Sequence, residues 1–199
     1  ADYTFSDKSK HKAGSIGNIG CTSFFPSKNL GCYGDGGALY TNDDILASRI
    51  RMIANHGQSV QYYHDKVGVN SRLDSIQAAI LNQKLPHLDE YAQRRNELAA
   101  FYDNAFAGCE KVTIPSRKKN STHVFHQYTL LLNGVNRDDF KKKMADKGVP
   151  CMIYYPIPLH NQKAYKTPLL SDIDFPISTD LCARVISLPM HTEMDLEQK

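Results

Sequence analysis

Two side chains near the start of the chain, Lys28 and Ser23, have the types and surroundings that chemistry requires. Lys28 lies between an apolar, strand-like segment (22–25) and a glycine-rich turn (31–37). A lysine amine held at the mouth of a sheet is partly desolvated and can condense with an aldehyde. Ser23 can donate its hydroxyl proton to a phosphate, and the amides of residues 34–37 follow soon after it. The residues alone indicate a weak phosphate site, since the spacing matches no P-loop and a lysine after a strand is more often a surface residue.

Short strands and helices are expected to position these two side chains. Strands are predicted over 2–5, 21–25 and 38–41, with many glycines in the turns between them. Asn42-Asp43-Asp44 can cap a helix that runs to about Ala54. A longer helical pattern starts near Asp74 and ends at Gly108, and Pro86 should break or kink it.

From about residue 110 the pattern changes to a small α/β unit. It predicts a strand over 124–132, a charged helix over 137–146 that is stopped by Gly148, and a strand over 149–155. The proline-rich stretch that follows, from 156 to 176, is predicted to be ordered loop.

Composition and charge exclude several classes of function. A net charge of +3 is too mild to require a nucleic-acid partner, and the short clusters 117–119 and 141–143 are expected to be solvated. Five cysteines without a CxxC pair disfavour disulfides and a thiolate metal site, and fit a reducing cytoplasm. Neither an apolar run of about 20 residues nor a signal peptide is present, so no membrane partner is expected. His123 and His126 would point to opposite faces of a strand, so no metal site is predicted.

Several separated motifs resemble one family of enzymes. The run SFFPSKNLGCYGDGGA at 23–38 resembles the cofactor-lysine segment of the DegT/DnrJ/EryC1/StrS nucleotide-sugar aminotransferases. HGQ at 56–58, GVNSRLDSIQAAIL at 68–81 and YYPIPLH at 154–160 follow in that family's order. The resemblance covers nearly the whole chain.

The resemblance implies a role for individual residues. Lys28 corresponds to the lysine that binds pyridoxal 5′-phosphate (PLP) as a Schiff base and later moves protons, and Ser23 to the serine that holds the cofactor phosphate. Asn70 corresponds to an asparagine that reaches the phosphate of the neighbouring subunit of a homodimer. Residues expected near the nucleotide-sugar substrate are Arg72, Tyr154, Tyr155 and His160.

The resemblance also implies an architecture and a reaction. The fold class would be α/β, a fold-type I PLP-transferase, with a partial large domain over 1–107, which includes the long connecting helix, and a small C-terminal domain over 108–199. The reaction would transfer an amino group from an amino acid such as glutamate to a keto group on a nucleotide-linked hexose, in surface polysaccharide or amino-sugar biosynthesis. UDP-linked N-acetylated keto sugars are the expected substrates.

The sequence also departs from the family in its length, and alternatives remain. Family members are about twice as long, and the part expected before residue 1 carries an aspartate that pairs with the pyridine nitrogen. The chain is therefore expected to be a fragment that binds PLP poorly alone and exposes a sheet edge. The alternatives are a non-catalytic oligomerisation or regulatory module, a generic phosphate-binding domain, and a PLP-dependent sugar dehydratase, against which Lys28 argues because dehydratases tend to have histidine there. Asn70 and Arg72 can also merely shape and cap a turn, and Tyr154 and Tyr155 can be packing residues.

Overall fold

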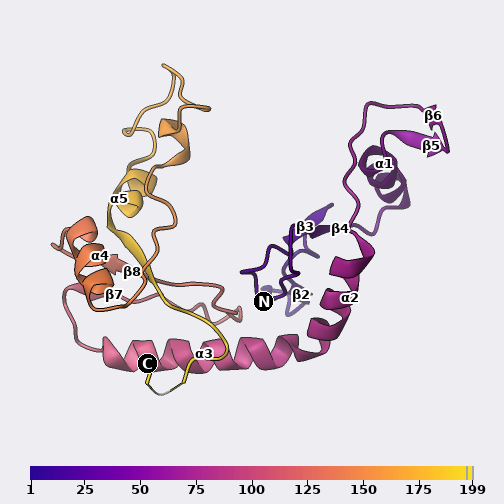
Figure 1. Ribbon diagram of the computed structural model, residues 1–199. Coiled ribbons are helices and arrows are strands. Elements are labelled where there is room, and N and C mark those ends of the chain that lie inside the picture. The colour runs from indigo at the N-terminus through magenta and orange to yellow at the C-terminus, as the bar shows by residue number, and fades with distance from the viewer. Residues whose placement is uncertain (196, 199) are drawn as a thin grey trace. The chain divides into compact units, whose positions relative to one another are not determined.

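The computed structural model describes residues 1–195 and 197–198, which form two compact units. Unit 1 consists of residues 1–92 and 117–124, and unit 2 of residues 93–116 and 125–199 (Figure 1). The predicted division into a large-domain segment (1–107) and a small domain (108–199) concerns the complete protein and stays a prediction.

Unit 1 begins with two antiparallel hairpins. β1 (Asp2–Thr4) pairs with β2 (Lys10–Lys12), and β3 (Gly20–Ser23) pairs with β4 (Gly37–Tyr40). The segment 120–122 adds main-chain hydrogen bonds along β1, from Thr4 N to Asn120 O and from Thr122 N to Asp2 O. That pairing joins residues more than 100 positions apart, so no local pattern indicated it.

A helix and a third hairpin follow. α1 (Asp44–Ala54) begins where predicted, because the Asp43 carboxylate accepts the amides of Ile45 and Leu46. β5 (Gln58–Val60) and β6 (Tyr63–His64) form an antiparallel hairpin beside the end of α1.

The long helical pattern is interrupted at Pro86, as predicted. α2 (Ser75–Lys84) leads into the 3-10 turn η1 (Leu85–His87), and α3 (Leu88–Ala105) continues after it. Asp74 caps α2 by accepting the amide of Gln77. The boundary between the two units falls inside α3.

Unit 2 has a three-stranded antiparallel sheet in the order β7-β8-β9. The strands are β7 (Val112–Thr113), β8 (Tyr128–Leu132) and β9 (Val185–Leu188). The side chains of β8 alternate between buried and half-buried, which gives the sheet a core face. With one face of α3 they form the hydrophobic core, whose buried members include Leu98, Ala99, Tyr102, Phe125, Leu130 and Ile186.

Three predictions for unit 2 were wrong in part. The strand expected over 149–155 is a single bridge between Met152 and Ser187. The strand expected from residue 124 starts only at Tyr128, since Phe125 has a left-handed φ of 41°. The loop expected at Pro176 begins helix α5 (Pro176–Arg184), because proline fits the first turn of a helix. The helix α4 (Arg137–Asp146) has the predicted bounds.

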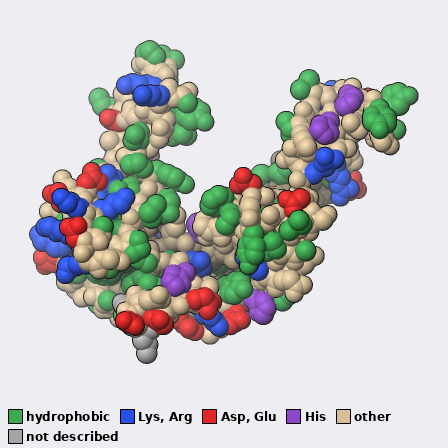
Figure 2. Space-filling view, viewed as in Figure 1, with side chains coloured by type: hydrophobic (Ala, Val, Ile, Leu, Met, Phe, Trp, Pro, Cys, Tyr) green, Lys and Arg blue, Asp and Glu red, His purple; other side chains and the backbone are tan. Residues whose placement is uncertain are grey.

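The two units differ in how much apolar surface they bury. Among the described residues of unit 1, the buried hydrophobic side chains are those of Cys32 and Leu81. Figure 2 shows hydrophobic side chains on the surface around the β5–β6 hairpin, where Tyr62 is 79% and Tyr63 70% exposed. Most of the buried hydrophobic side chains among the described residues therefore belong to unit 2, while unit 1 exposes much of its apolar surface.

The five cysteines are free thiols. Within the described part of the chain, no helix is both long and apolar enough to cross a membrane.

Candidate active site

Lys28 lies on a turn between β3 and β4 that main-chain hydrogen bonds hold at its base. Lys28 N donates to Phe25 O at 2.8 Å, and Cys32 N donates to Phe24 O at 2.8 Å. The buried Cys32 thiol contacts the Phe24 and Gly34 carbonyl oxygens at 3.0 and 2.9 Å. The backbone of the predicted cofactor lysine is therefore fixed by the turn itself.

Distant residues fix the same turn from outside. The Asn29 side chain donates to Val124 O at 2.9 Å, and Lys84 Nζ donates to Gly31 O at 2.7 Å. A Cβ at Gly31 would lie 2.5 Å from Pro26 O, so only glycine allows the turn to close. These contacts were not visible in the sequence, because the partners lie 53 and 95 positions away.

The Lys28 side chain is half-buried, and its amine is free of contacts with other polar groups among the described residues. Within the described part of the chain, its Nζ has no hydrogen bond or ion pair. Two other lysines of unit 1 do make side-chain contacts. Lys84 Nζ also lies over the Tyr33 ring, 4.5 Å from its centroid, and Lys12 Nζ forms an ion pair with Asp2 at 2.8 Å. A fixed backbone with a free amine is the arrangement that a covalent attachment site needs.

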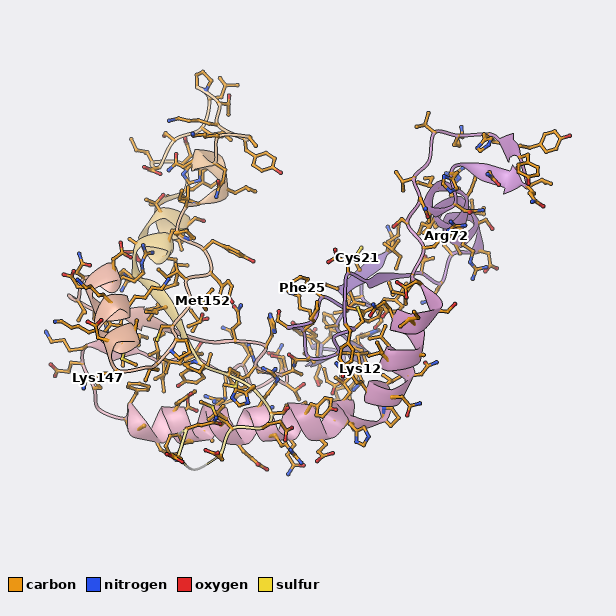
Figure 3. All side chains as sticks on the ribbon, viewed as in Figure 1. Lys12, Cys21, Phe25, Arg72, Lys147 and Met152 are labelled. Carbon is orange, nitrogen blue, oxygen red and sulfur yellow. The ribbon has the colours of Figure 1, made fainter. Side chains whose placement is uncertain are left out.

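Ser23 is the last residue of β3 and lies opposite Gly37 of β4. Its Oγ accepts a hydrogen bond from Phe25 N at 3.2 Å, which leaves the hydroxyl proton for another acceptor. The side chain is exposed, at the end of β3 from which the Lys28 turn begins (Figure 3 labels Phe25, two residues further along). The structure therefore places the two side chains on one short stretch of backbone.

Asn70 and Arg72 lie on a segment that caps the C-terminal end of α1. The last carbonyl groups of this helix accept hydrogen bonds from main-chain amides that follow it. Asn55 N donates to Arg51 O and Met52 O, Gly57 N to Met52 O, Val69 N to Ile53 O, and Ser71 N to Ala54 O. The residues on either side of Asn70 are thus tied to the helix end by their backbones. Capping of α2 is done by Asp74 and not by Asn70 or Arg72.

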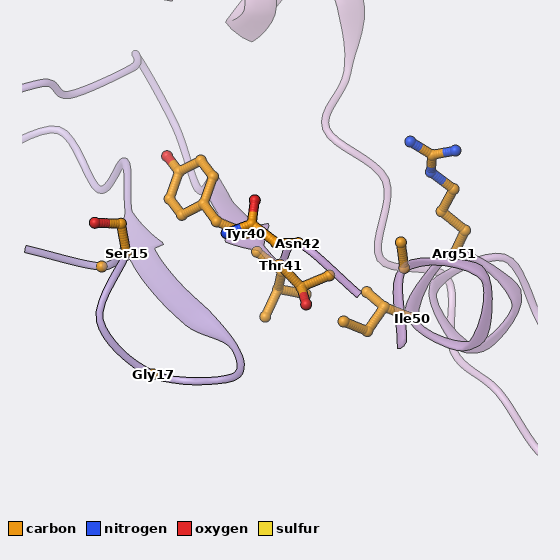
Figure 4. A pocket seen from close by; sticks show the side chains of 10 residues that line it. Ser15, Gly17, Tyr40, Thr41, Asn42, Ile50 and Arg51 are labelled. Carbon is orange, nitrogen blue, oxygen red and sulfur yellow. The ribbon is translucent and has the colours of Figure 1, made fainter. Parts of the chain in front are cut away.

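The side chains of Asn70 and Arg72 are exposed and contact each other. Arg72 Nε donates to Asn70 Oδ1 at 3.1 Å, which leaves the Asn70 amide nitrogen as a donor. Arg72, labelled in Figure 3, lines two hollows of about 430 and 610 Å³ beside α1, and Arg51 also lines the larger one. Another hollow, of about 410 Å³ between β4 and α1, is lined by Tyr40, Ile50 and Arg51 and contains none of the predicted site residues (Figure 4).

Tyr154 and Tyr155 belong to unit 2 and follow the Met152 bridge. Their rings meet edge to face with centroids 5.7 Å apart, and the residues are 36% and 70% exposed. They are thus accessible to a ligand and are not core residues.

His160 is the predicted site residue with the most contacts. It lies in the 3-10 turn η2 (Leu159–Asn161), is 8% exposed, and stacks on Phe175 with ring centroids 4.8 Å apart. Its Nε2 lies 2.9 Å from Asp172 Oδ1. Sequence reasoning missed Asp172, because the chain between His160 and Asp172 has no strand or further helix whose periodicity could bring the two side chains together.

Asp172 collects hydrogen bonds from three side chains. Besides His160, Asn161 Nδ2 donates to it at 2.7 Å and Thr179 Oγ1 at 2.9 Å. The bond from His160 first, and then those from Thr179 and Asn161, lower the pKa of the Asp172 carboxyl. The carboxylate is therefore ionised at neutral pH and acts as an acceptor only.

Comparison with known proteins shows which family the chain belongs to. The model of the DegT/DnrJ/EryC1/StrS aminotransferase family matches residues 3–199. The chain belongs to this family. The predicted family and the predicted fold class, a partial fold-type I PLP-transferase of the α/β class, are confirmed.

Three relatives show how the chain compares within the DegT/DnrJ/EryC1/StrS family. A "UDP-2-acetamido-2-deoxy-3-oxo-D-glucuronate aminotransferase" of Pseudomonas aeruginosa is 44% identical and covers 90% of this chain and 48% of its own. A "pleiotropic regulatory protein" of Geobacillus stearothermophilus is 41% identical over 94% of this chain and 50% of its own. The crystal structure of S. venezuelae DesV, in complex with a ketimine intermediate, matches with a TM-score of 0.85 and 36% identity, over 92% of this chain and 49% of that one. The chain spans about half the length of the curated relatives it matches.

The residues of the Lys28 turn fit the PLP that membership of this family implies. The free Lys28 amine suits its aldehyde, and the Ser23 hydroxyl, with its proton unused, suits its phosphate. Both side chains lie at the end of one strand, where they can hold one small molecule.

Proposed function

We propose that the complete protein to which this chain belongs is a PLP-dependent sugar aminotransferase. It transfers the amino group of an amino acid, glutamate in our proposal, to a keto group on a nucleotide-linked hexose. The observation that carries the proposal is the free Lys28 amine on a turn whose backbone is fixed at both ends. Membership of an aminotransferase family supports a role for that amine in transamination.

Lys28 would hold the cofactor through its amine and, once released, move protons. When bound, PLP supplies an aldehyde that takes up the amino group and a ring that accepts electrons from the adjacent carbon. Lys28 Nζ would take the proton from the α-carbon of the donor and, in the second half of the reaction, would deliver a proton to the sugar carbon that gains the nitrogen. The fixed backbone would anchor the flexible side chain from which Nζ would reach both carbons.

Ser23 and Asn70 would bind the cofactor phosphate from two subunits. Ser23 donates its hydroxyl proton from the same chain as Lys28. Asn70 would donate its amide from the partner subunit of a homodimer, and the α1 cap supports this because it holds the Asn70 backbone while leaving the side chain exposed. The active site would therefore be shared between protomers.

The remaining predicted residues would bind the sugar nucleotide. Arg72 presents a guanidinium to a hollow large enough for a carboxylate or diphosphate, and exposed Tyr154 and Tyr155 offer rings and hydroxyls to the sugar nucleotide. The Pseudomonas aeruginosa relative is named for a UDP-linked 2-acetamido-3-oxo sugar. We propose a substrate of the same class, within surface polysaccharide or amino-sugar biosynthesis.

Covalent trapping of the cofactor tests the proposal. Full-length protein is incubated with PLP, reduced with borohydride and digested, and mass spectrometry should find the pyridoxyl group on Lys28. Lys28→Arg keeps the charge but should lose the label and the turnover, since a guanidinium does not condense with the aldehyde. Lys10→Arg, at an exposed lysine of β2, is the matched control and should keep both. A label on another lysine, or full activity of Lys28→Arg, would refute the assignment.

A regulatory role without catalysis is the second candidate, and the name of the Geobacillus stearothermophilus relative favours it. The regulatory role predicts that the wild-type full-length protein carries no pyridoxyl label and forms no amino sugar.

Lys28 argues against a PLP-dependent dehydratase. That alternative predicts release of water from the sugar without consumption of glutamate.

A further inference from the structure

The imidazole of His160 is held so that only one of its nitrogens remains available. An ionised carboxylate accepts hydrogen bonds but cannot donate them, so His160 Nε2 must carry the proton in the bond to Asp172. Stacking on Phe175 at an interplanar angle of 27° prevents the ring from turning. Within the described residues Nδ1 has no hydrogen-bond partner. In the neutral ring Nδ1 is therefore an acceptor with a fixed direction.

Asp172 also links the two elements that flank a long exposed loop, η2 and α5. His160 and Asn161 lie on η2, while Thr179 lies on α5, and all three donate to the same carboxylate oxygen, Asp172 Oδ1. Between these elements the chain runs exposed, with Tyr165 63% and Leu169 87% accessible. One carboxylate thus fixes the position of η2 relative to α5.

We propose that Asp172 is a positioning residue of the sugar-nucleotide pocket and acts through His160. The inference rests on the proposed function, in which His160 lines that pocket. Asp172 determines that Nε2 is the nitrogen that donates and fixes the place of η2, and His160 Nδ1 then accepts a hydrogen bond from a hydroxyl or N–H group of the sugar nucleotide. A phosphate is not the partner, because it offers no proton to an acceptor.

Coupling between the two residues tests the proposal. Binding of UDP-N-acetylglucosamine to the full-length holoenzyme is measured by calorimetry, because this probe carries the UDP and acetamido groups without reacting. His160→Ala and Asp172→Asn should each weaken binding about tenfold. If Asp172 acts through His160, the double variant should also be weakened only about tenfold, whereas independent effects would give about a hundredfold. Equal affinities of wild type and single variants, or additive effects, would overturn the proposal.

A matched control separates the hydrogen bond from the charge. Asp174→Asn removes a carboxylate in the same loop that bonds to Ser171 and does not contact His160 by a hydrogen bond. Its affinity for the probe should stay within about twofold of wild type. Should Asp172→Asn fail to fold, Thr179→Val removes one donor from Asp172 and should weaken binding about threefold. Unchanged binding by Thr179→Val would then count against the proposal.

The donor half of the reaction distinguishes this inference from the proposed function. Asp172→Asn should keep the Lys28 label and the rate at which glutamate changes the cofactor absorption, because the sugar nucleotide takes no part in that step. Loss of both in the wild type contradicts the function. Their loss in Asp172→Asn alone contradicts the inference, because it indicates general damage.

Discussion

At the scale of single residues, a buried guanidinium holds unit 2 together. Arg95 of α3 is 8% exposed, and its Nη1 lies within 3.0 to 3.2 Å of the carbonyl oxygens of Phe125, His126 and Met190. Burial lowers the pKa of Arg95, but a guanidinium remains charged at any physiological pH. At Nη1 the charge thus meets carbonyl dipoles from two segments far apart in sequence.

Replacing this arginine should be costly. We expect Arg95→Met to lower the free energy of unfolding by about 3 kcal/mol, because three carbonyl groups lose a charged donor. Urea denaturation of the full-length protein, followed by circular dichroism, measures the change.

The neighbouring arginine provides the control for this experiment. Arg94 forms a surface pair with Glu193 at 3.1 Å, and Arg94→Ala should cost about 0.5 kcal/mol. Equal losses for the two variants would show that the buried carbonyl contacts contribute little.

At the scale of elements, the loop after α1 depends on two glycines that touch. Gly57 has a φ of 74°, and a Cβ there would lie 1.8 Å from Lys66 O. A Cβ at Gly68 would lie 2.1 Å from Gly57 N. The close approach of these two backbones lets the segment that carries Asn70 return to the end of α1.

Gly57→Ala should therefore disrupt this loop. A left-handed φ alone costs about 1–2 kcal/mol, and the clash with main chain adds to it, so we expect a loss of about 3 kcal/mol or more. Gly108→Ala is the matched control, since Gly108 has a φ of 75° but nothing within 4 Å of the added methyl group. It should cost about 1 kcal/mol. Limited proteolysis near residues 57–68 and urea denaturation distinguish the two variants; similar curves would contradict the packing argument.

At the scale of the whole molecule, the proposed site depends on two copies of the chain. If Asn70 serves the partner's cofactor, each active site takes Lys28 from one protomer and Asn70 from the other. In a twofold-symmetric dimer, two different inactive variants can then complement each other.

Mixing variants tests this sharing. Lys28→Ala and Asn70→Ala homodimers should each have little activity, and subunit exchange between the full-length proteins should restore roughly a quarter of the wild-type activity. Half of the dimers would be mixed, and each would contain one intact site. No recovery, with mixed dimers confirmed by mass spectrometry, would place Asn70 in the site of its own chain.

Much of the local structure could be predicted from the sequence. The cap at Asp43, the break at Pro86 and the bounds of α4 follow from contacts between residues a few positions apart, which a sequence displays directly. The ordered motifs around Lys28, Asn70 and His160 likewise indicated the family, which is confirmed. The roles of these residues in the reaction stay predictions.

Tertiary structure alone decided the long-range arrangement. β9 is buried at all four positions, so it has no alternation to reveal it, and its pairing with β8 joins segments more than 50 residues apart. The bonds of Asp172 to His160 and of Arg95 to distant carbonyls depend equally on folding. The sequence by itself determined which side chains can bind a cofactor or substrate, because it specifies their residue types and the local turns that carry them. Only the fold decided which of them are free, as Lys28 is, and which are already held, as His160 is.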